Sequence, residues 1–156
     1  MSTVVACLVL SACGNWVTTE VSGRTAVGVR DDGSAFLLVA PCGAAYDEIH
    51  VSGDRQGLDP DEENPQVGSW TLETPLEETF EIDLGGVPAG WEGSPRSVHI
   101  DADHGYIADA SSSSVDVQTS QVYFRGRQLS SLSVDEVLVG NRQVWTRKRF
   151  EADACK

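Results

Sequence analysis

Short runs in which apolar and polar residues alternate are the feature of this sequence that most constrains its fold. In residues 79–84, for example, Phe80, Ile82 and Leu84 alternate with polar residues. Side chains two positions apart in an extended strand point to the same face, so these three apolar residues are expected to face a core. Similar runs recur between stretches rich in Gly, Pro and Asp. The pattern predicts seven to nine short strands and no long amphipathic helix.

The predicted fold is therefore all-β: an antiparallel β-sandwich of the immunoglobulin type, with a small closed β-barrel as the alternative. Residues 34–40 (SAFLLVA) are almost continuously apolar and are expected to form a central strand covered on both faces. Leu129, Leu132 and Val137 fall near helical spacing and predict one or two short helical turns. The other runs expected to form strands are residues 25–30, 46–52, 67–73, 79–84, 96–103, 105–110, 115–125 and 143–150.

The N-terminus has the sequence pattern of an export signal. Residues 3–10 (TVVACLVL) form an apolar run too short to span a bilayer, which fits the apolar region of a signal peptide. The next residues, Leu10-Ser11-Ala12-Cys13, resemble the bacterial lipobox, in which the cysteine thiol receives diacylglycerol. A buried first strand is the alternative interpretation of residues 3–10.

The expected domain organisation follows from that motif. Residues 1–12 are expected to be a lipoprotein signal peptide, residues 13–23 a tether and residues 24–156 a single β-sandwich domain. Lipid on Cys13 would hold the domain at the extracytoplasmic face of the cell membrane. No Lys or Arg occurs among residues 1–3, where a signal peptide usually has one. We therefore expect the true start to lie upstream, although export that tolerates the uncharged start is the alternative.

The four cysteines support the same prediction. Cleavage before Cys13 would remove Cys7, and acylation would consume Cys13 itself. Cys42 and Cys155 remain, and in an oxidising compartment they are expected to form a disulfide. Two separate buried thiols are the alternative. No C-x-x-C pair occurs, so the cysteines do not predict a local zinc site.

The distribution of charge argues against nucleic acid as a partner. The formal net charge is −13 at pH 7, and most of the acidic residues lie between positions 47 and 116. A phosphate backbone would be repelled by this segment. Solubility is the simplest explanation of the acidity, and a surface for cations or basic ligands is the alternative.

Two acidic segments are candidate metal sites. On a strand, His99, Asp101 and Asp103 would project from one face, and imidazole with carboxylates suits Zn²⁺ or Mn²⁺. The loop at residues 54–64 carries several carboxylates that suit Ca²⁺, but it lacks the pattern of an EF-hand. Ordinary solvent-facing polar residues are the simpler interpretation of both segments.

The C-terminal third of the chain is basic. Two aromatic residues, Tyr123 and Trp145, lie among its cationic residues, and an anionic glycan or wall polymer is a possible ligand for such a surface. Charge balance against the acidic strands is the alternative. The cationic residues concerned are Arg125, Arg127, Arg142, Arg147, Lys148 and Arg149.

Several short motifs resemble a group of small, uncharacterised lipoproteins of high-GC Gram-positive (actinobacterial) bacteria. These are the run AVGVRDDGSAFLLVAPCG, the tripeptide Ala89-Gly90-Trp91, the segment around Val122-Tyr123-Phe124 and the C-terminal Cys155. The resemblance implies export, lipidation and pairing of Cys42 with Cys155. It implies no activity. The chain departs from the group in its uncharged N-terminus and its very acidic middle.

No motif in the sequence predicts catalysis. The chain has no G-x-S-x-G motif, no P-loop and no dinucleotide-binding fingerprint. We therefore expect a non-enzymatic, lipid-anchored module without a cofactor, which binds an envelope protein or wall polymer. A metal-binding protein and a structural envelope protein are the alternatives.

Overall fold

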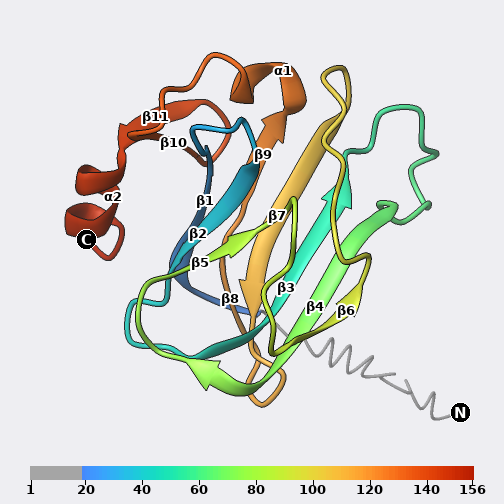
Figure 1. Cartoon of the computed structure of the whole chain (residues 1–156). Helices are drawn as coiled ribbons and strands as arrows, with labels where there is room; N and C mark the ends of the chain where they lie inside the picture. The colour runs from blue at the N-terminus through green and yellow to red at the C-terminus, as the bar shows by residue number, and fades with distance from the viewer. Residues whose placement is uncertain (1–18) are drawn as a thin grey trace, which may run out of the picture.

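The structure is a computed structural model that describes residues 19–156, so the predicted signal peptide and Cys13 lie outside the described residues. Strands dominate the fold, and the two helices are short (Figure 1). The strands are β1 (Glu20–Val29), β2 (Ala35–Ala40), β3 (Tyr46–Gly53), β4 (Gln66–Leu76), β5 (Phe80–Asp83), β6 (Trp91–Ser94), β7 (Gly105–Ser111), β8 (Val117–Ser120), β9 (Val122–Arg125), β10 (Glu136–Val139) and β11 (Gln143–Thr146). The helices are α1 (Gly126–Leu129) and α2 (Arg147–Asp153).

The strands form one hydrogen-bonded sheet that curls around a core, and β1 is its junction. One arm of the sheet runs β11-β10-β1-β2-β5, and the other runs β8-β7-β3-β4-β6, with β9 also paired to β7. The first half of β1 pairs with β8 in parallel, and its second half pairs with β10 antiparallel. Because β1 belongs to both ladders, it joins the two arms (Figure 1).

The predicted all-β fold is confirmed, and the two arms enclose the core as the layers of a sandwich do. Antiparallel pairing holds for every described strand pair except β1 with β8, so the sheet is mixed. The structure has eleven strands among residues 19–156, more than the expected seven to nine. The additional strands are short: residues 115–125 contribute two, and β6 lies in a segment expected to be a loop. Strand β10 contains Val137, so the prediction of a helical turn was wrong at that residue, and α1 ends at Leu129.

Strand β2 is buried on both faces, as its continuous apolar sequence predicted. Leu37 and Val39 point into the main core, which residues of both arms fill. Phe36 and Leu38 point the other way, into a second apolar cluster that includes Phe150 of α2. Burial of apolar side chains on both faces makes β2 a central source of stability. We call this second group the α2 cluster; it comprises Ala26, Phe36, Leu38, Ala40, Val137, Val139, Phe150 and Ala154.

Helix α2 replaces the second half of the strand expected over residues 143–150, so that prediction was wrong beyond Thr146. Thr146 caps the helix, because its hydroxyl accepts a hydrogen bond from the backbone N–H of Arg149. Phe150 is fully buried against β2. Among residues 19–156, no helix is long and apolar enough to cross a lipid bilayer.

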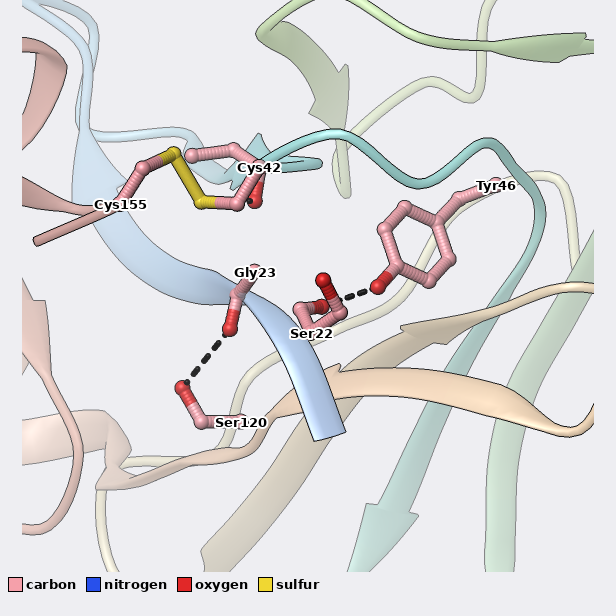
Figure 2. Close-up of a disulfide and its surroundings, with 7 residues drawn as sticks. Ser22, Gly23, Cys42, Tyr46, Ser120 and Cys155 are labelled. Carbon is pink, nitrogen blue, oxygen red and sulfur yellow. Dashed lines mark hydrogen bonds between the residues drawn. A yellow bond between two sulfur atoms is a disulfide. The ribbon is translucent and has the colours of Figure 1, made fainter. Parts of the chain in front are cut away.

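The predicted disulfide between Cys42 and Cys155 is confirmed. Its Cα atoms are 5.1 Å apart, and it joins the turn after β2 to the segment that follows α2 (Figure 2). Nearby, the Tyr46 hydroxyl donates a hydrogen bond to the carbonyl of Ser22 in β1. The disulfide therefore holds the C-terminal helix against the arm that contains β1 and β2.

Candidate binding site

The segment proposed to hold a metal does not form the predicted strand. Between residues 96 and 103 the backbone makes hydrogen bonds outside any ladder: the N–H of Val98 donates to Leu84 O at 2.6 Å, and Ala102 O accepts from Arg127 N at 2.9 Å. The carboxylate of Asp101 accepts from the backbone N–H of Asp103 at 2.9 Å. Short acidic side chains that bond to neighbouring backbone in this way favour turns over strands.

As a result, His99 and the two aspartates line different cavities. His99 lines a cavity of 790 Å³ together with apolar residues such as Leu129, whereas Asp101 and Asp103 line another, of 800 Å³, beside Asp54. The pKa of Asp101 is lowered, mainly because its carboxylate accepts a hydrogen bond from the backbone N–H of Asp103. A hydrogen bond with the His104 side chain lowers it further. Within residues 19–156, no group of three or more His, Cys, Asp or Glu side chains is placed to hold a metal ion.

The acidic loop at residues 54–64 is closed around Arg55. The guanidinium donates to the backbone carbonyls of Glu62 and Asp59, each at 2.7 Å, and of Pro60 at 3.1 Å. Backbone carbonyls and carboxylates are the ligands that Ca²⁺ uses in protein loops. In this loop the Arg55 guanidinium already donates hydrogen bonds to three of the backbone carbonyls that Ca²⁺ would use.

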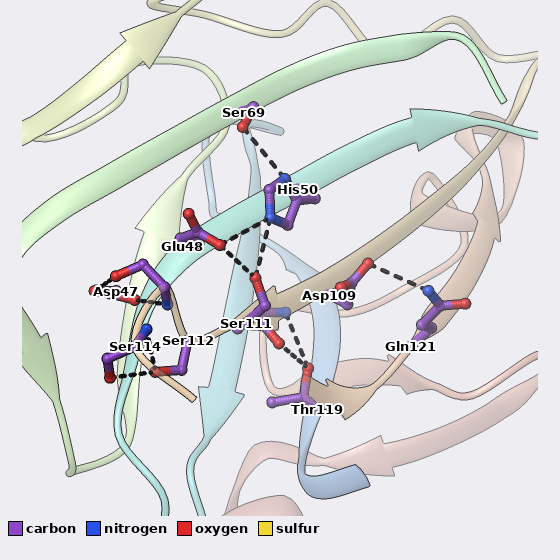
Figure 3. A network of polar contacts seen from close by, with 12 residues as sticks. Asp47, Glu48, His50, Ser69, Asp109, Ser111, Ser112, Ser114, Thr119 and Gln121 are labelled. Carbon is purple, nitrogen blue, oxygen red and sulfur yellow. Dashed lines mark hydrogen bonds and ion pairs between the residues drawn. The ribbon is translucent and has the colours of Figure 1, made fainter. Parts of the chain in front are cut away.

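A polar network that the sequence analysis missed lies on the outer face of β3, β4 and β7 (Figure 3). His50 lies between two serine hydroxyls, with Nδ1 3.2 Å from Ser69 Oγ and Nε2 3.1 Å from Ser111 Oγ. Ser111 Oγ also donates to Glu48 at 2.9 Å. The alternation of residues 46–52 contained the signal, because it places Glu48 and His50 on one face. These contacts join three strands through half-buried side chains.

Three arginines of the basic C-terminal third gather at one end of the molecule. Arg125 ends β9, Arg127 lies in α1, and Arg142 lies in the turn between β10 and β11 (Figure 1). They line a cavity of 450 Å³. An adjoining cavity of 830 Å³ shares Tyr123, Asn141 and Arg142 with it. Together we call these two cavities the arginine groove; it is lined by Ile107, Gln121, Tyr123, Arg125, Arg127, Gln128, Gly140, Asn141, Arg142 and Gln143.

Backbone contacts assemble the groove from segments distant in sequence. The N–H of Tyr123 donates to Gly140 O at 2.8 Å, which brings the β10–β11 turn over β9. Gly140 has a φ of +59°, a conformation that glycine adopts at low cost. On the other side, the N–H of Arg125 donates to Gln128 Oε1 at 2.7 Å, which orients this amide at the start of α1.

Arg147 and Arg149 of the predicted basic patch make other contacts. Arg147 forms an ion pair with Glu81, which also binds Arg30 at 3.2 Å. The Arg149 guanidinium lies 4.3 Å from the centre of the Trp145 ring. The tertiary structure therefore divides the basic segment into two groups. Arg147 and Arg149 pack against the arm that contains β2, and the other arginines line the groove.

The groove arginines are far less engaged. Among residues 19–156, neither Arg127 nor Arg142 forms an ion pair, while Arg125 Nε donates to the Tyr123 hydroxyl at 3.3 Å. The Tyr123 hydroxyl in turn donates to Asp54 at 3.2 Å, and its hydrogen bond to Arg125 raises the pKa of this guanidinium. The site is thus a cationic hollow bordered by tyrosine and amide side chains.

Comparisons with protein-family models, with curated proteins and with solved structures give no match.

Proposed function

We propose that this chain is an exported, lipid-anchored domain of the bacterial cell envelope that binds a ligand and is not an enzyme. The disulfide between Cys42 and Cys155 is the observation that carries the proposal. Disulfides persist in oxidising compartments outside the cytoplasm and are rare within it. The lipobox-like residues Leu10 to Cys13 supply the anchor.

The distance between the anchor and the domain supports a module held close to the membrane. Cys13 precedes the start of β1 at Glu20 by seven positions. Even fully extended, seven residues reach no further than about 25 Å. A domain joined to its lipid anchor by so short a segment would bind ligands at the membrane surface or in the adjacent wall.

Ligand binding, rather than a purely structural role, is favoured by the arginine groove. Three guanidinium groups border one hollow in a chain whose net charge is −13. Cations of an acidic protein that are not used in ion pairs are available for a ligand. We therefore place binding at this end of the molecule.

Lipidation can be tested in cells that express the gene with its own upstream sequence. We expect labelled palmitate to enter the wild-type chain, which should fractionate with membranes and give an intact mass that begins at the acylated Cys13. Cys13→Ser should abolish both labelling and cleavage. Cys7→Ser is the matched control, because it removes a cysteine of the predicted signal peptide and should leave lipidation unchanged.

A different result would overturn the proposal. It would fail if the wild-type chain were found in the cytosol, unlabelled, with Cys42 and Cys155 reduced. It would also fail if Cys13→Ser were labelled as strongly as the wild-type chain.

A further inference from the structure

We propose that the arginine groove binds an anionic glycan, a sugar chain that carries carboxylate groups. The inference deepens the proposed function, since it rests on the chain being an envelope binding domain and names the ligand class.

The charge of the groove points to an acidic ligand. Arginine presents a planar fork of N–H donors that matches a carboxylate or phosphate with two parallel hydrogen bonds. Arg127 and Arg142 form no ion pair among residues 19–156, so a ligand need not displace an internal carboxylate from them. The net charge of −13 opposes nonspecific binding of polyanions to the molecule as a whole.

The shape of the groove points to a chain rather than a single small anion. The cavities of 830 Å³ and 450 Å³ adjoin through the three residues that line both, Tyr123, Asn141 and Arg142. A ligand with several linked units can occupy both cavities. Acidic groups on successive units would then meet Arg142 at the junction and Arg127 in the smaller cavity.

The other lining groups favour sugar over peptide. Amide side chains both donate and accept hydrogen bonds, as sugar hydroxyls require. Tyr123 adds an aromatic ring with a polar hydroxyl at the centre of the groove. Ile107 is the one aliphatic side chain in the lining of the groove. The amide residues are Gln121, Gln128, Asn141 and Gln143.

The groove is also held in shape before a ligand arrives. The hydrogen bond from Tyr123 N to Gly140 O fixes the β10–β11 turn. A second hydrogen bond, from Arg127 N to Ala102 O, fixes the start of α1. Both contacts are made by backbone atoms, so they persist when the side chains are changed. Preorganisation of this kind reduces the ordering cost of binding.

Calorimetry on the full chain, purified with its disulfide intact, tests the proposal. Three probes separate the possible chemistries: hexagalacturonate, uncharged maltohexaose and linear polyphosphate. We expect hexagalacturonate to bind at least about tenfold more tightly than maltohexaose, because each carboxylate–guanidinium contact is a charge-assisted hydrogen bond. Polyphosphate, which has charge without sugar, should bind more weakly than hexagalacturonate.

Two double variants with equal loss of charge locate the site. Arg127→Ala with Arg142→Ala should weaken hexagalacturonate binding at least about tenfold. Lys148→Ala with Arg149→Ala removes two positive charges outside the groove and should change the affinity less than about twofold. Circular dichroism and the disulfide mass verify that each variant is folded.

The proposal is wrong if hexagalacturonate gives no heat at millimolar concentration, if maltohexaose or polyphosphate binds as tightly, or if both double variants lose affinity equally. These outcomes are distinct from failure of the proposed anchoring. A cytosolic chain that binds hexagalacturonate would refute export alone, and a lipidated chain that does not bind it would refute the glycan alone.

Discussion

Two threonine hydroxyls are buried side by side where β1 meets β8. Thr25 Oγ1 and Thr119 Oγ1 are 2.7 Å apart, and both residues are fully buried. Thr119 Oγ1 also accepts a hydrogen bond from the backbone N–H of Ala110 in β7, at 2.9 Å (Figure 3). A buried polar group is costly unless it is paired, so this three-strand contact stabilises the parallel junction.

Replacing Thr119 with valine should destabilise the fold. The change keeps the shape of the side chain but leaves the Ala110 N–H and the Thr25 hydroxyl without their partner, at an expected cost of about 1–3 kcal/mol. Thr25→Val should cost less, because the bond between Thr119 and Ala110 survives. Urea unfolding with the disulfide intact measures both variants. Equal stability of Thr119→Val and the wild-type chain would contradict the role given to this hydroxyl.

Asp109 is the residue through which pH should change the free energy of unfolding. Burial raises the pKa of Asp109 above its ordinary value of 3.8, although His50 and the Gln121 hydrogen bond oppose this rise. Between 3.8 and the raised pKa, the folded chain holds a proton that the unfolded chain has lost. Stability contributed by this group is therefore lost as pH rises through that window.

Asp109→Asn should accordingly be more stable than the wild-type chain at pH 7. The amide oxygen can still accept the hydrogen bond from Gln121, whose Nε2 lies 3.3 Å from Asp109 Oδ1, and it carries no buried charge. The advantage should shrink as pH falls from the raised pKa towards 3.8, and it should vanish below 3.8, where the carboxyl group is neutral in both the folded and the unfolded chain. Unfolding free energies across pH measure the effect, with Asp61→Asn in the exposed loop as the control. If Asp109→Asn were less stable than the wild-type chain at pH 7, the argument would be refuted.

Helix α2, β2 and the disulfide act together as one unit of the fold. The helix covers the second face of β2 through Phe150, and the bond from Cys155 to Cys42 ties its end to the turn after that strand. The disulfide spans 113 positions in sequence. A crosslink across a long loop restricts the unfolded chain strongly, which favours the folded state.

Removal of the disulfide should therefore be costly. Cys42→Ala with Cys155→Ala is expected to lower the free energy of unfolding by about 4–5 kcal/mol. Chemical denaturation of this variant, of the reduced wild-type chain and of the oxidised wild-type chain provides the comparison. The reduced chain should resemble the double variant. A loss well below about 1 kcal/mol in both would show that packing of α2 alone maintains this unit.

At the scale of the whole molecule, the net charge of −13 opposes folding through repulsion among carboxylates. Described ion pairs such as those of Arg30 and Arg147 with Glu81 offset part of this repulsion. Salt screens long-range repulsion between exposed charges more than it weakens partly buried pairs. The molecule should therefore respond to ionic strength as an acidic protein does.

Raising NaCl from about 10 to about 150 mM shortens the screening length from about 30 to about 8 Å, and the Tm should rise by a few degrees. Scanning calorimetry measures this shift, and choline chloride at equal ionic strength should reproduce it. A fall in Tm would mean that ion pairs, rather than repulsion, dominate the electrostatic free energy.

Alternation of apolar residues determined the strand character of most of the chain, because a period of two arises within each strand and needs no distant partner. The continuous apolar run of β2 likewise indicated burial on both faces. The pairing of Cys42 with Cys155 was predicted by counting the cysteines that would remain after the expected processing, and the structure contains this disulfide. Each of these signals is local or compositional, and the amino-acid sequence expresses it directly.

Tertiary structure alone decided which residues meet. Val115 alternates with Val117 yet is 58% exposed, because β8 begins only at Val117. His99 and Asp101 are two positions apart but line different cavities, since a turn takes the place of the expected strand. Arg125 and Arg142 line one cavity because the hydrogen bond from Tyr123 N to Gly140 O brings the β10–β11 turn over β9. Arg147, five positions after Arg142, instead binds Glu81 of β5. Contacts between segments far apart in sequence depend on register and packing across the whole sheet, which no local pattern of residues specifies.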